Sequence, residues 1–297
     1  GFDVASSGNT TDVCGEFVKE CRKQEIAPAF YYCLWGGKWK PNSNARAIIL
    51  AQLHELATRY GEIPYFWLDM MNWAPPDLST QEIYDALKSL QPNAVVMFNQ
   101  HVQDGTKINY FPTDLVNGEL VPPPATGHEP SRMVDGKTYY LPFEYSLVSQ
   151  SRKGGYKYDP IGPSCWFTYG EGKDFTPSNP FPAEALAKQI CLGWKRGAAN
   201  VLLATAPDHS GRMRPEDVEQ LRQLGQILRG EGGVFGGKTP LQILAMLGAK
   251  GEAGAHPDKL HEYHRIFGFL DANDDGNLSA KEFVEDGRYM TREARQG

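Results

Sequence analysis

The sequence lacks several features that would assign a protein to a class at once. No apolar run approaches the roughly 20 residues that a membrane-spanning helix needs, so no membrane span is expected. The formal net charge is −6 and Lys and Arg form no cluster, which argues against a nucleic-acid partner. The five cysteines are scattered, without the spacing of a zinc site or a disulfide framework. What remains is a globular protein, and 41% hydrophobic residues can supply a substantial core.

Short β-rich runs alternate with amphipathic helical segments through most of the chain. Strands are expected at residues 29–34, 64–69, 94–98, 138–147 and 200–206, and helices at residues 11–24, 45–60, 80–90, 183–194 and 215–228. Such an α/β pattern predicts a parallel sheet with helices outside it, and a (β/α)8 TIM-type barrel is the simplest closure. Five strands are counted where the barrel has eight, so the N-terminal strands are expected to be missing. Residues 99–137 are expected to form one long connection.

The C-terminal part carries the most specific motif of the chain. Residues 230–238 are Gly-rich and predict a linker, and residues 239–297 predict a small all-α appendage. Residues 271–282 place oxygen-bearing groups at the ligand positions of an EF-hand loop, with Gly276 at its sharp turn. The expected Ca²⁺ ligands are Asp271, Asn273, Asp275, Asn277, Ser279 and Glu282. A polar turn between two helices is the alternative, although it would need neither Gly276 nor Glu282 at these offsets.

The expected calcium ion is structural. An EF-hand offers no open position for an activated water, so no metal or other cofactor is expected in catalysis. No second loop precedes this one, so its partner lies beyond Gly297 or the hand is solitary. Nothing in the sequence indicates an oligomeric state.

The strand at residues 64–69 is the best candidate for a catalytic element. Because strand side chains alternate, Tyr65, Trp67 and Asp69 share one face, and Phe66 and Leu68 share the other. Asp69 falls at the carboxyl end of the strand, where barrel enzymes have their active sites. A carboxylate beside aromatic rings suits a carbohydrate, since the rings stack on sugar C–H surfaces. Asp69 as a strand-end cap of the following turn is an equally good interpretation of the pattern.

Several segments resemble the α-L-fucosidases of glycoside hydrolase family 29. Residues 60–69 (YGEIPYFWLD) resemble the segment that bears the family's nucleophilic aspartate. Residues 12–23 (DVCGEFVKECRK) and 30–35 (FYYCLW) resemble a helix and the strand after it. Residues 200–208 (NVLLATAPD), with Gly211 and Arg212, are similar to the family's final strand and turn. The resemblance covers residues 1–229, which are expected to form a partial barrel.

The resemblance implies retaining hydrolysis of a terminal α-L-fucose by two carboxylates about 5 to 6 Å apart. It assigns the nucleophile to Asp69 and a place in the fucose pocket to Trp67. Tyr32 is also expected at the sugar, although Tyr31 is nearly as eligible.

The acid/base residue is expected on a variable loop. Residues 114–119 resemble a segment that carries it in one branch of the family, so Glu119 leads. Glu144 is the alternative, and Glu129 is a third candidate. Trp73 and Trp166 are expected near the substrate, although core packing explains Trp166 almost as well.

The chain departs from the family in two respects. None of its seven histidines forms the pair that holds the sugar hydroxyls, and that pair belongs to strands expected before Gly1. The arginine after residues 94–98 is replaced, since only Asn99, Gln100 or His101 is available there.

The resemblance implies that the partner is a fucosylated glycan or polysaccharide. An exo-glycosidase of another deoxy- or galacto-configured sugar, or a non-catalytic calcium- or sugar-binding barrel, is the alternative. The resemblance also implies a secreted or periplasmic protein, and the chain alone need not be active.

Overall fold

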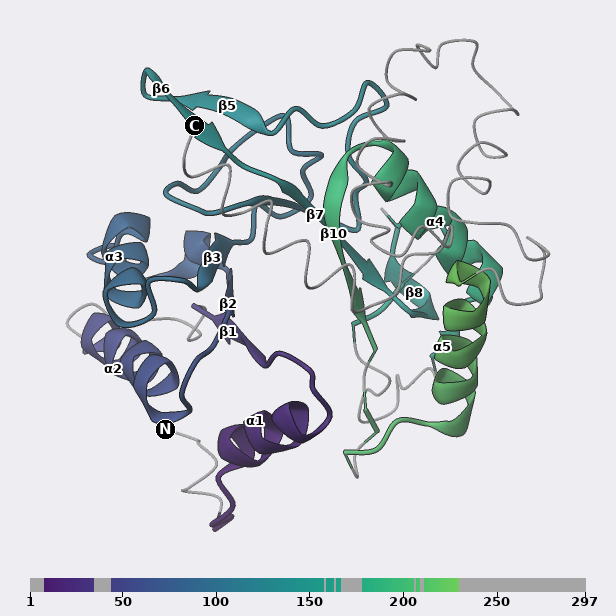
Figure 1. Ribbon diagram of the computed structural model, residues 1–297, viewed down its shortest axis with the longest axis horizontal. Helices are drawn as coiled ribbons and strands as arrows, with labels where there is room; N and C mark the ends of the chain where they lie inside the picture. The colour runs from purple at the N-terminus through teal and green to yellow at the C-terminus, as the bar shows by residue number, and fades with distance from the viewer. Residues whose placement is uncertain are drawn as a thin grey trace, which may run out of the picture. The chain divides into compact units, whose positions relative to one another are not determined.

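The computed structural model describes residues 8–34, 44–157, 159–162, 164–166, 178–205, 207–208 and 211–229 (Figure 1). The chain divides into two compact units: Gly1–Leu147 with Arg196–Leu203, and Val148–Lys195 with Ala204–Gly297. The expected linker and the EF-hand segment lie outside the described residues, so both remain predictions.

The first unit opens with repeated β–α units. Strands β1 (Ala29–Cys33), β2 (Tyr65–Asp69) and β3 (Val95–Phe98) form one parallel sheet in the order β1-β2-β3. Helix α2 (Ala45–Arg59) connects β1 to β2, and α3 (Thr80–Leu90) connects β2 to β3, as parallel pairing requires. Helix α1 (Val13–Lys23) precedes β1, and the Asp12 carboxylate caps it by accepting from the backbone N–H of Gly15. This confirms the expected α/β alternation for residues 11–98.

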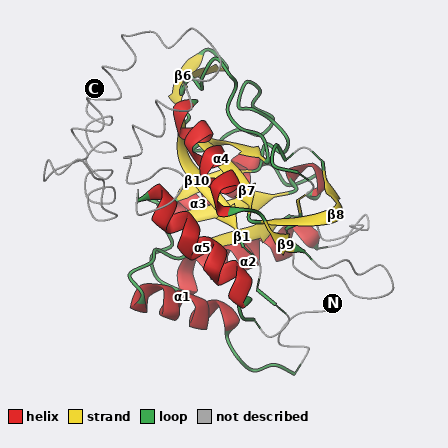
Figure 2. Ribbon diagram, turned by 90° about the vertical axis from the view of Figure 1, so that its right-hand side faces the viewer, coloured by secondary structure: helices red, strands yellow, loops and turns green. Residues whose placement is uncertain are grey.

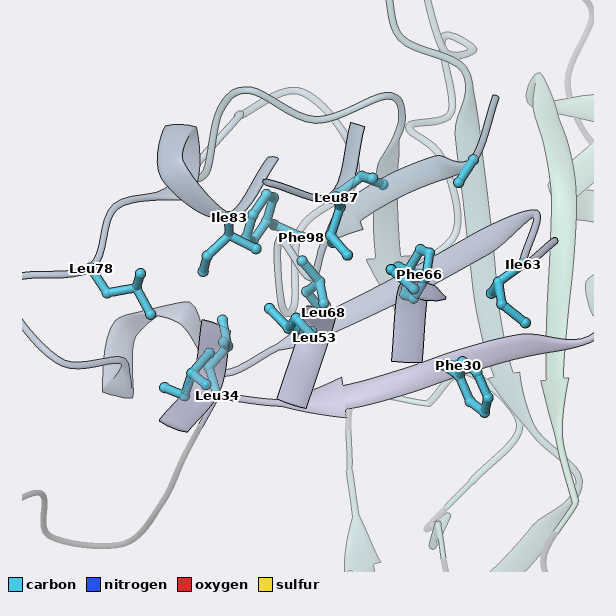
Figure 3. Close-up of a cluster of buried hydrophobic side chains, with 14 of the residues drawn as sticks. Phe30, Leu34, Leu53, Ile63, Phe66, Leu68, Leu78, Ile83, Leu87 and Phe98 are labelled. Atoms are coloured by element: carbon cyan, nitrogen blue, oxygen red, sulfur yellow. The ribbon is translucent and has the colours of Figure 1, made fainter. Parts of the chain in front are cut away.

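The core of the first unit lies between this sheet and its helices. Phe66 and Leu68 of β2 are fully buried there, against Leu53 of α2 and Leu87 of α3 (Figure 3). Trp67, between them in sequence, packs on the opposite face of the sheet with Met97 and Leu115. The alternation read from residues 64–69 is therefore confirmed, and Asp69 points to the same face as Trp67.

A second sheet of the first unit contains a strand that sequence reasoning missed. β4 (Val116–Glu119), β7 (Phe143–Val148) and β10 (Ala198–Ala204) have the order β10-β7-β4, and β4 and β7 are parallel. Residues 99–137 are thus not one connection, since they contain β4 and also β5 (Ser131–Val134). The four-residue β4 escapes detection because its Asn and Gly disfavour strands.

A hairpin divides the strand that was expected at residues 138–147. β5 pairs antiparallel with β6 (Lys137–Tyr140), and β7 starts only at Phe143. The described strands form two three-stranded sheets and two two-stranded pairs, so the α/β class holds while the closed barrel remains a prediction.

The second unit has a smaller sheet and two packed helices. β8 (Gln150–Tyr156) pairs antiparallel with β9 (Asn179–Pro180), and helices α4 (Ala183–Lys195) and α5 (Pro215–Leu228) contact each other (Figure 2). The buried carboxylate of Asp217 accepts from the guanidinium of Arg214 and from the side-chain amide of Gln150. Among the helices described here, none is long and apolar enough to cross a membrane.

Candidate active site

Asp69 lies where β2 ends, and its carboxylate accepts three hydrogen bonds. The Tyr31 hydroxyl donates to Oδ2 at 2.6 Å, while the backbone N–H of Met70 and the amide Nδ2 of Asn99 donate to Oδ1 at 2.8 and 2.9 Å. The bond from Met70 is the one expected of a strand-end cap, since the short 3₁₀ helix η1 (Met71–Trp73) follows at once. A cap does not require donors from β1 and from the segment after β3, so the arrangement goes beyond capping.

Asn99 connects Asp69 to a second carboxylate. Its Nδ2 donates both to Asp69 Oδ1 and to Glu119 Oε2, each at 2.9 Å. Two bonds of 2.9 Å that share one nitrogen put the two oxygens at most 5.8 Å apart. The structure therefore brings Asp69 and Glu119 together, and this upper limit is compatible with the distance between the carboxyl groups of retaining glycosidases, about 5 to 5.5 Å.

Glu119 is the last residue of β4 rather than a loop residue. Parallel pairing with β7 aligns it with Ser146. The position before it, residue 118, requires glycine, because a Cβ there would lie 2.0 Å from the carbonyl oxygen of Val121. The backbone N–H of Glu119 donates to the carbonyl of His101 at 3.3 Å, which joins the end of β4 to the segment after β3. The expectation of a loop position was wrong, because β4 itself was not recognised.

His101 adds a titratable group beside this pair. Its Nδ1 lies 3.8 Å from Glu119 Oε2, and its backbone is left-handed with φ of 62°. The Glu119 carboxylate, with a smaller contribution from Asp69, raises the pKa of His101, and partial burial opposes this. Its buried Nε2 has no hydrogen-bond partner in the part of the chain that is described. A protonated His101 would thus stabilise negative charge on Glu119.

Glu144, the alternative acid/base residue, is buried within the first unit. Its side chain on β7 is fully inaccessible and accepts from the Tyr65 hydroxyl, the Trp67 ring N–H and the Asn200 amide at 3.0, 2.9 and 2.7 Å. Burial raises the pKa of Glu144, and these three donors oppose the rise. With both carboxylate oxygens engaged by protein donors, Glu144 is positioned to support Trp67 rather than to reach a leaving group.

The structure places Tyr31, not Tyr32, at the candidate nucleophile. Tyr31 aligns with Trp67 across β1 and β2, and the two rings stack with centroids 5.4 Å apart. Tyr32 points to the helical side, where its hydroxyl donates to Gln52 of α2 at 2.6 Å. The geometry therefore favours Tyr31, the alternative named from the sequence, because one residue is enough to reverse the face of a strand, and contact of either tyrosine with a sugar remains a prediction.

Three other predicted residues have different surroundings. Trp67 is 8% exposed beneath Tyr31, whereas Trp73 in η1 is 53% exposed. Trp166 is half-buried and belongs to the second unit, so its place near a substrate remains a prediction.

Glu129, the third candidate, bonds to the backbone at the start of β5. It precedes β5, where its Oε1 accepts from the backbone N–H of Ser131, and it lines a shallow pocket of about 250 Å³ with His128 and Arg132. The six expected calcium ligands lie outside the described residues. Within the described part of the chain, no group of three or more His, Cys, Asp or Glu side chains could hold a metal ion.

Asn99 is the residue whose part in the site sequence reasoning missed. It was considered only as one replacement for an arginine. The available signal was its position directly after β3, equivalent to that of Asp69 at the end of β2, since the carboxyl ends of parallel strands share one edge.

Comparisons with known proteins agree on one family. The sequence pattern of the α-L-fucosidase family matches residues 1–233. No curated protein matches the chain. Among solved structures, α-L-fucosidase isoenzyme 1 from Paenibacillus thiaminolyticus is 17% identical with a TM-score of 0.54, covering 75% of this chain and 53% of that one. A candidate α-L-fucosidase from Bacteroides thetaiotaomicron is 21% identical with a TM-score of 0.53, covering 74% and 48%. The chain spans about half the length of these two structures, and such identities show a shared fold alone.

Proposed function

The chain belongs to the α-L-fucosidase family, and from this premise we propose that the protein is a retaining exo-glycosidase that removes terminal α-L-fucose from glycans. The observation that carries the proposal is the single amide of Asn99 that bonds to both Asp69 and Glu119. Two carboxylates at that separation leave room for a sugar ring carbon, but not for the additional water that an inverting enzyme places between them.

The proposed chemistry uses the two carboxylates in turn. Asp69 attacks the anomeric carbon as the bond to the leaving oxygen breaks, and Glu119 transfers its proton to that oxygen. Glu119 then takes a proton from a water molecule, whose oxygen displaces Asp69 from the anomeric carbon. Fucose is released and both side chains return to their initial states. The Tyr31 and Asn99 donors to Asp69 support this role, because they orient the attacking carboxylate.

A panel of aryl glycosides tests this proposal on the full-length protein. We expect turnover of an aryl α-L-fucoside, with nuclear magnetic resonance showing that the α configuration is released first. An α-L-galactoside and an α-L-rhamnoside serve as the galacto-configured and deoxy competitors. Preferred turnover of either would replace fucose in the proposal, and release of the β anomer would overturn the retaining mechanism. A protein that binds sugar or calcium but cleaves none of the substrates would be a non-catalytic barrel.

The two sheets of the first unit are proposed to be parts of a (β/α)8 barrel. The backbone N–H of Asp114, just before β4, donates to the carbonyl of Val96 in β3 at 2.9 Å, which supports continuity between the sheets. Glu144 of β7 bonds to Tyr65 and Trp67 of β2, as side chains do across a barrel interior. Secretion or export to the periplasm is proposed from family membership.

A structural Ca²⁺ ion in the loop at residues 271–282 is also proposed, with the six oxygen ligands named above. We expect Ca²⁺ to raise the melting temperature of the protein, because a ligand held only by the folded state adds about 2.7 kcal/mol at a hundredfold excess over Kd. Glu282→Gln should bind Ca²⁺ much more weakly by calorimetry, whereas the matched change Glu252→Gln, outside the loop, should bind as the wild type does. Chelation should leave the pH profile of hydrolysis unchanged. Absence of calcium binding by the wild type would remove the proposal.

A further inference from the structure

Asn99 is the centre of a buried hydrogen-bond network that ends on both carboxylates. Its side chain is 1% exposed, and its amide nitrogen donates to Asp69 and Glu119. Its amide oxygen accepts from the Asn117 amide and from the backbone N–H of His101, each at 2.8 Å. The amide nitrogen also lies 3.5 Å from Nδ1 of His101, and all of these partners belong to the first unit. Asn99 is therefore held on both sides.

The orientation of the Asn99 amide follows from the chemistry of its partners. A backbone N–H can only donate, so the atom that faces the N–H of His101 must be the oxygen. The opposite atom is then the NH₂ group, which carries two hydrogens, one for each carboxylate. Asn117 is oriented in turn, because its Oδ1 accepts from the backbone N–H of Gln100 at 2.8 Å and its Nδ2 faces Asn99. The backbone N–H groups of His101 and Gln100 thus fix the orientation of the two amides, and the NH₂ group of Asn99 faces the carboxylates as a result.

We propose that Asn99 is a positioning residue that holds Asp69 and Glu119 at the spacing of a retaining pair. The inference rests on the proposed function, because it specifies how that site works. The shared donor ties the carboxylate at the end of β2 to the carboxylate at the end of β4. Without it, the hydrogen bonds that join the two carboxylates through one side chain are lost.

The expected effect is on kcat rather than on KM. Both carboxylates act on the bond that breaks, so a change in their spacing lowers the rate of the chemical step more than it lowers the affinity for the sugar. His101, Tyr31 and Tyr110 also face the pair, and Nδ1 of His101 lies 3.5 Å from the Asn99 amide nitrogen, so a change at residue 99 also alters the surroundings of His101.

Two substitutions at position 99 and one at position 117 test the inference. Asn99→Asp keeps the shape but replaces the donor by a third carboxylate, and Asn99→Ala removes it. We expect kcat for an aryl fucoside to fall by about 10- to 100-fold, as for loss of a hydrogen bond to a charged group, with KM close to the wild-type value. Asn117→Asp keeps the acceptor for Gln100 and replaces the donor to Asn99 by an oxygen, which loosens the Asn99 amide although residue 117 bonds to neither carboxylate. A smaller fall in kcat, with KM close to the wild-type value, is then expected.

The control and the alternative outcome separate positioning from folding. Asn93→Asp, an exposed change in the turn before β3, adds the same charge and should leave kcat and KM unchanged. Crystal structures of the variants should show the two carboxyl groups farther apart than in the wild type, a result that does not depend on activity. Wild-type kcat in Asn99→Ala, or an unchanged carboxyl separation in its crystal structure, would overturn the inference. A wild type without fucoside turnover would instead refute the proposed function, and the structures would still decide the role of Asn99.

Discussion

Asp69→Ala is expected to lower kcat for an aryl α-L-fucoside by about a thousandfold or more, because it removes the group proposed to form the covalent bond to the sugar. The fold should survive, since Asp69 is the last residue of β2 and its side chain is not among the packed apolar residues between β2 and its helices. Melting temperature and circular dichroism check this. Asp85→Ala, which removes an exposed carboxylate of α3, should retain wild-type turnover.

Azide provides a chemical test of the same residue. In Asp69→Gly a small cavity replaces the carboxylate, and azide can attack the anomeric carbon from the same side while the aryl group leaves. The expected product is a fucosyl azide of inverted configuration, formed at a rate that increases with azide concentration. Substantial hydrolysis by Asp69→Ala, or azide rescue with retained configuration, would show that another group is the nucleophile.

Glu119→Gln is expected to have the second largest effect, and its size should depend on the leaving group. A glutamine cannot give up a proton, so fucosides with a poor leaving group should lose about two to four orders of magnitude in kcat/KM. A dinitrophenyl fucoside needs no protonation and should lose much less in the first step. Azide should restore turnover and yield a fucosyl azide of retained configuration, because the covalent intermediate still forms on Asp69.

Glu144→Gln is the matched comparison, because it makes the same change at a buried carboxylate. It should lower stability through its bonds to Tyr65, Trp67 and Asn200, and its effect on turnover should not depend on the leaving group. Since burial raises the pKa of Glu144, its stabilising contribution is fully present below the pKa of the unfolded chain and is lost as the pH rises through the folded value. The difference in melting temperature between wild type and variant should therefore shrink as the pH rises. A strong leaving-group dependence in Glu144→Gln, and none in Glu119→Gln, would transfer the acid/base role to Glu144.

Local patterns were enough to predict much of the fold. Alternation over residues 64–69 separated the core-facing Phe66 and Leu68 from Trp67 and Asp69. This follows because successive strand side chains point to opposite faces, and the apolar pair lies on the face that the helices cover. Helical periodicity located α1 to α5 in the same way. The strand β4 could not be found in this way. Its four residues are too few to show a two-residue alternation, and Asn and Gly have a low propensity for strands.

The candidate site depended on contacts that no local pattern contains. The sequence could name Glu119 first and Glu144 as the alternative, but only the tertiary structure distinguishes a carboxylate that shares a donor with Asp69 from one enclosed by three donors. Choosing Tyr31 over Tyr32 required the register between β1 and β2, which aligns Tyr31 with Trp67.

The sequence by itself determined the family and the strand that ends at Asp69, and it predicts a calcium-binding loop within twelve consecutive residues, because each of these is a property of short segments. The tertiary structure decided which side chains meet: Asn99 reaches residues 30 positions before it and 20 positions after it. The physical reason is strand register, since a shift of one residue turns every side chain of a strand to the opposite face and would exchange Tyr31 for Tyr32 and Asp69 for Leu68.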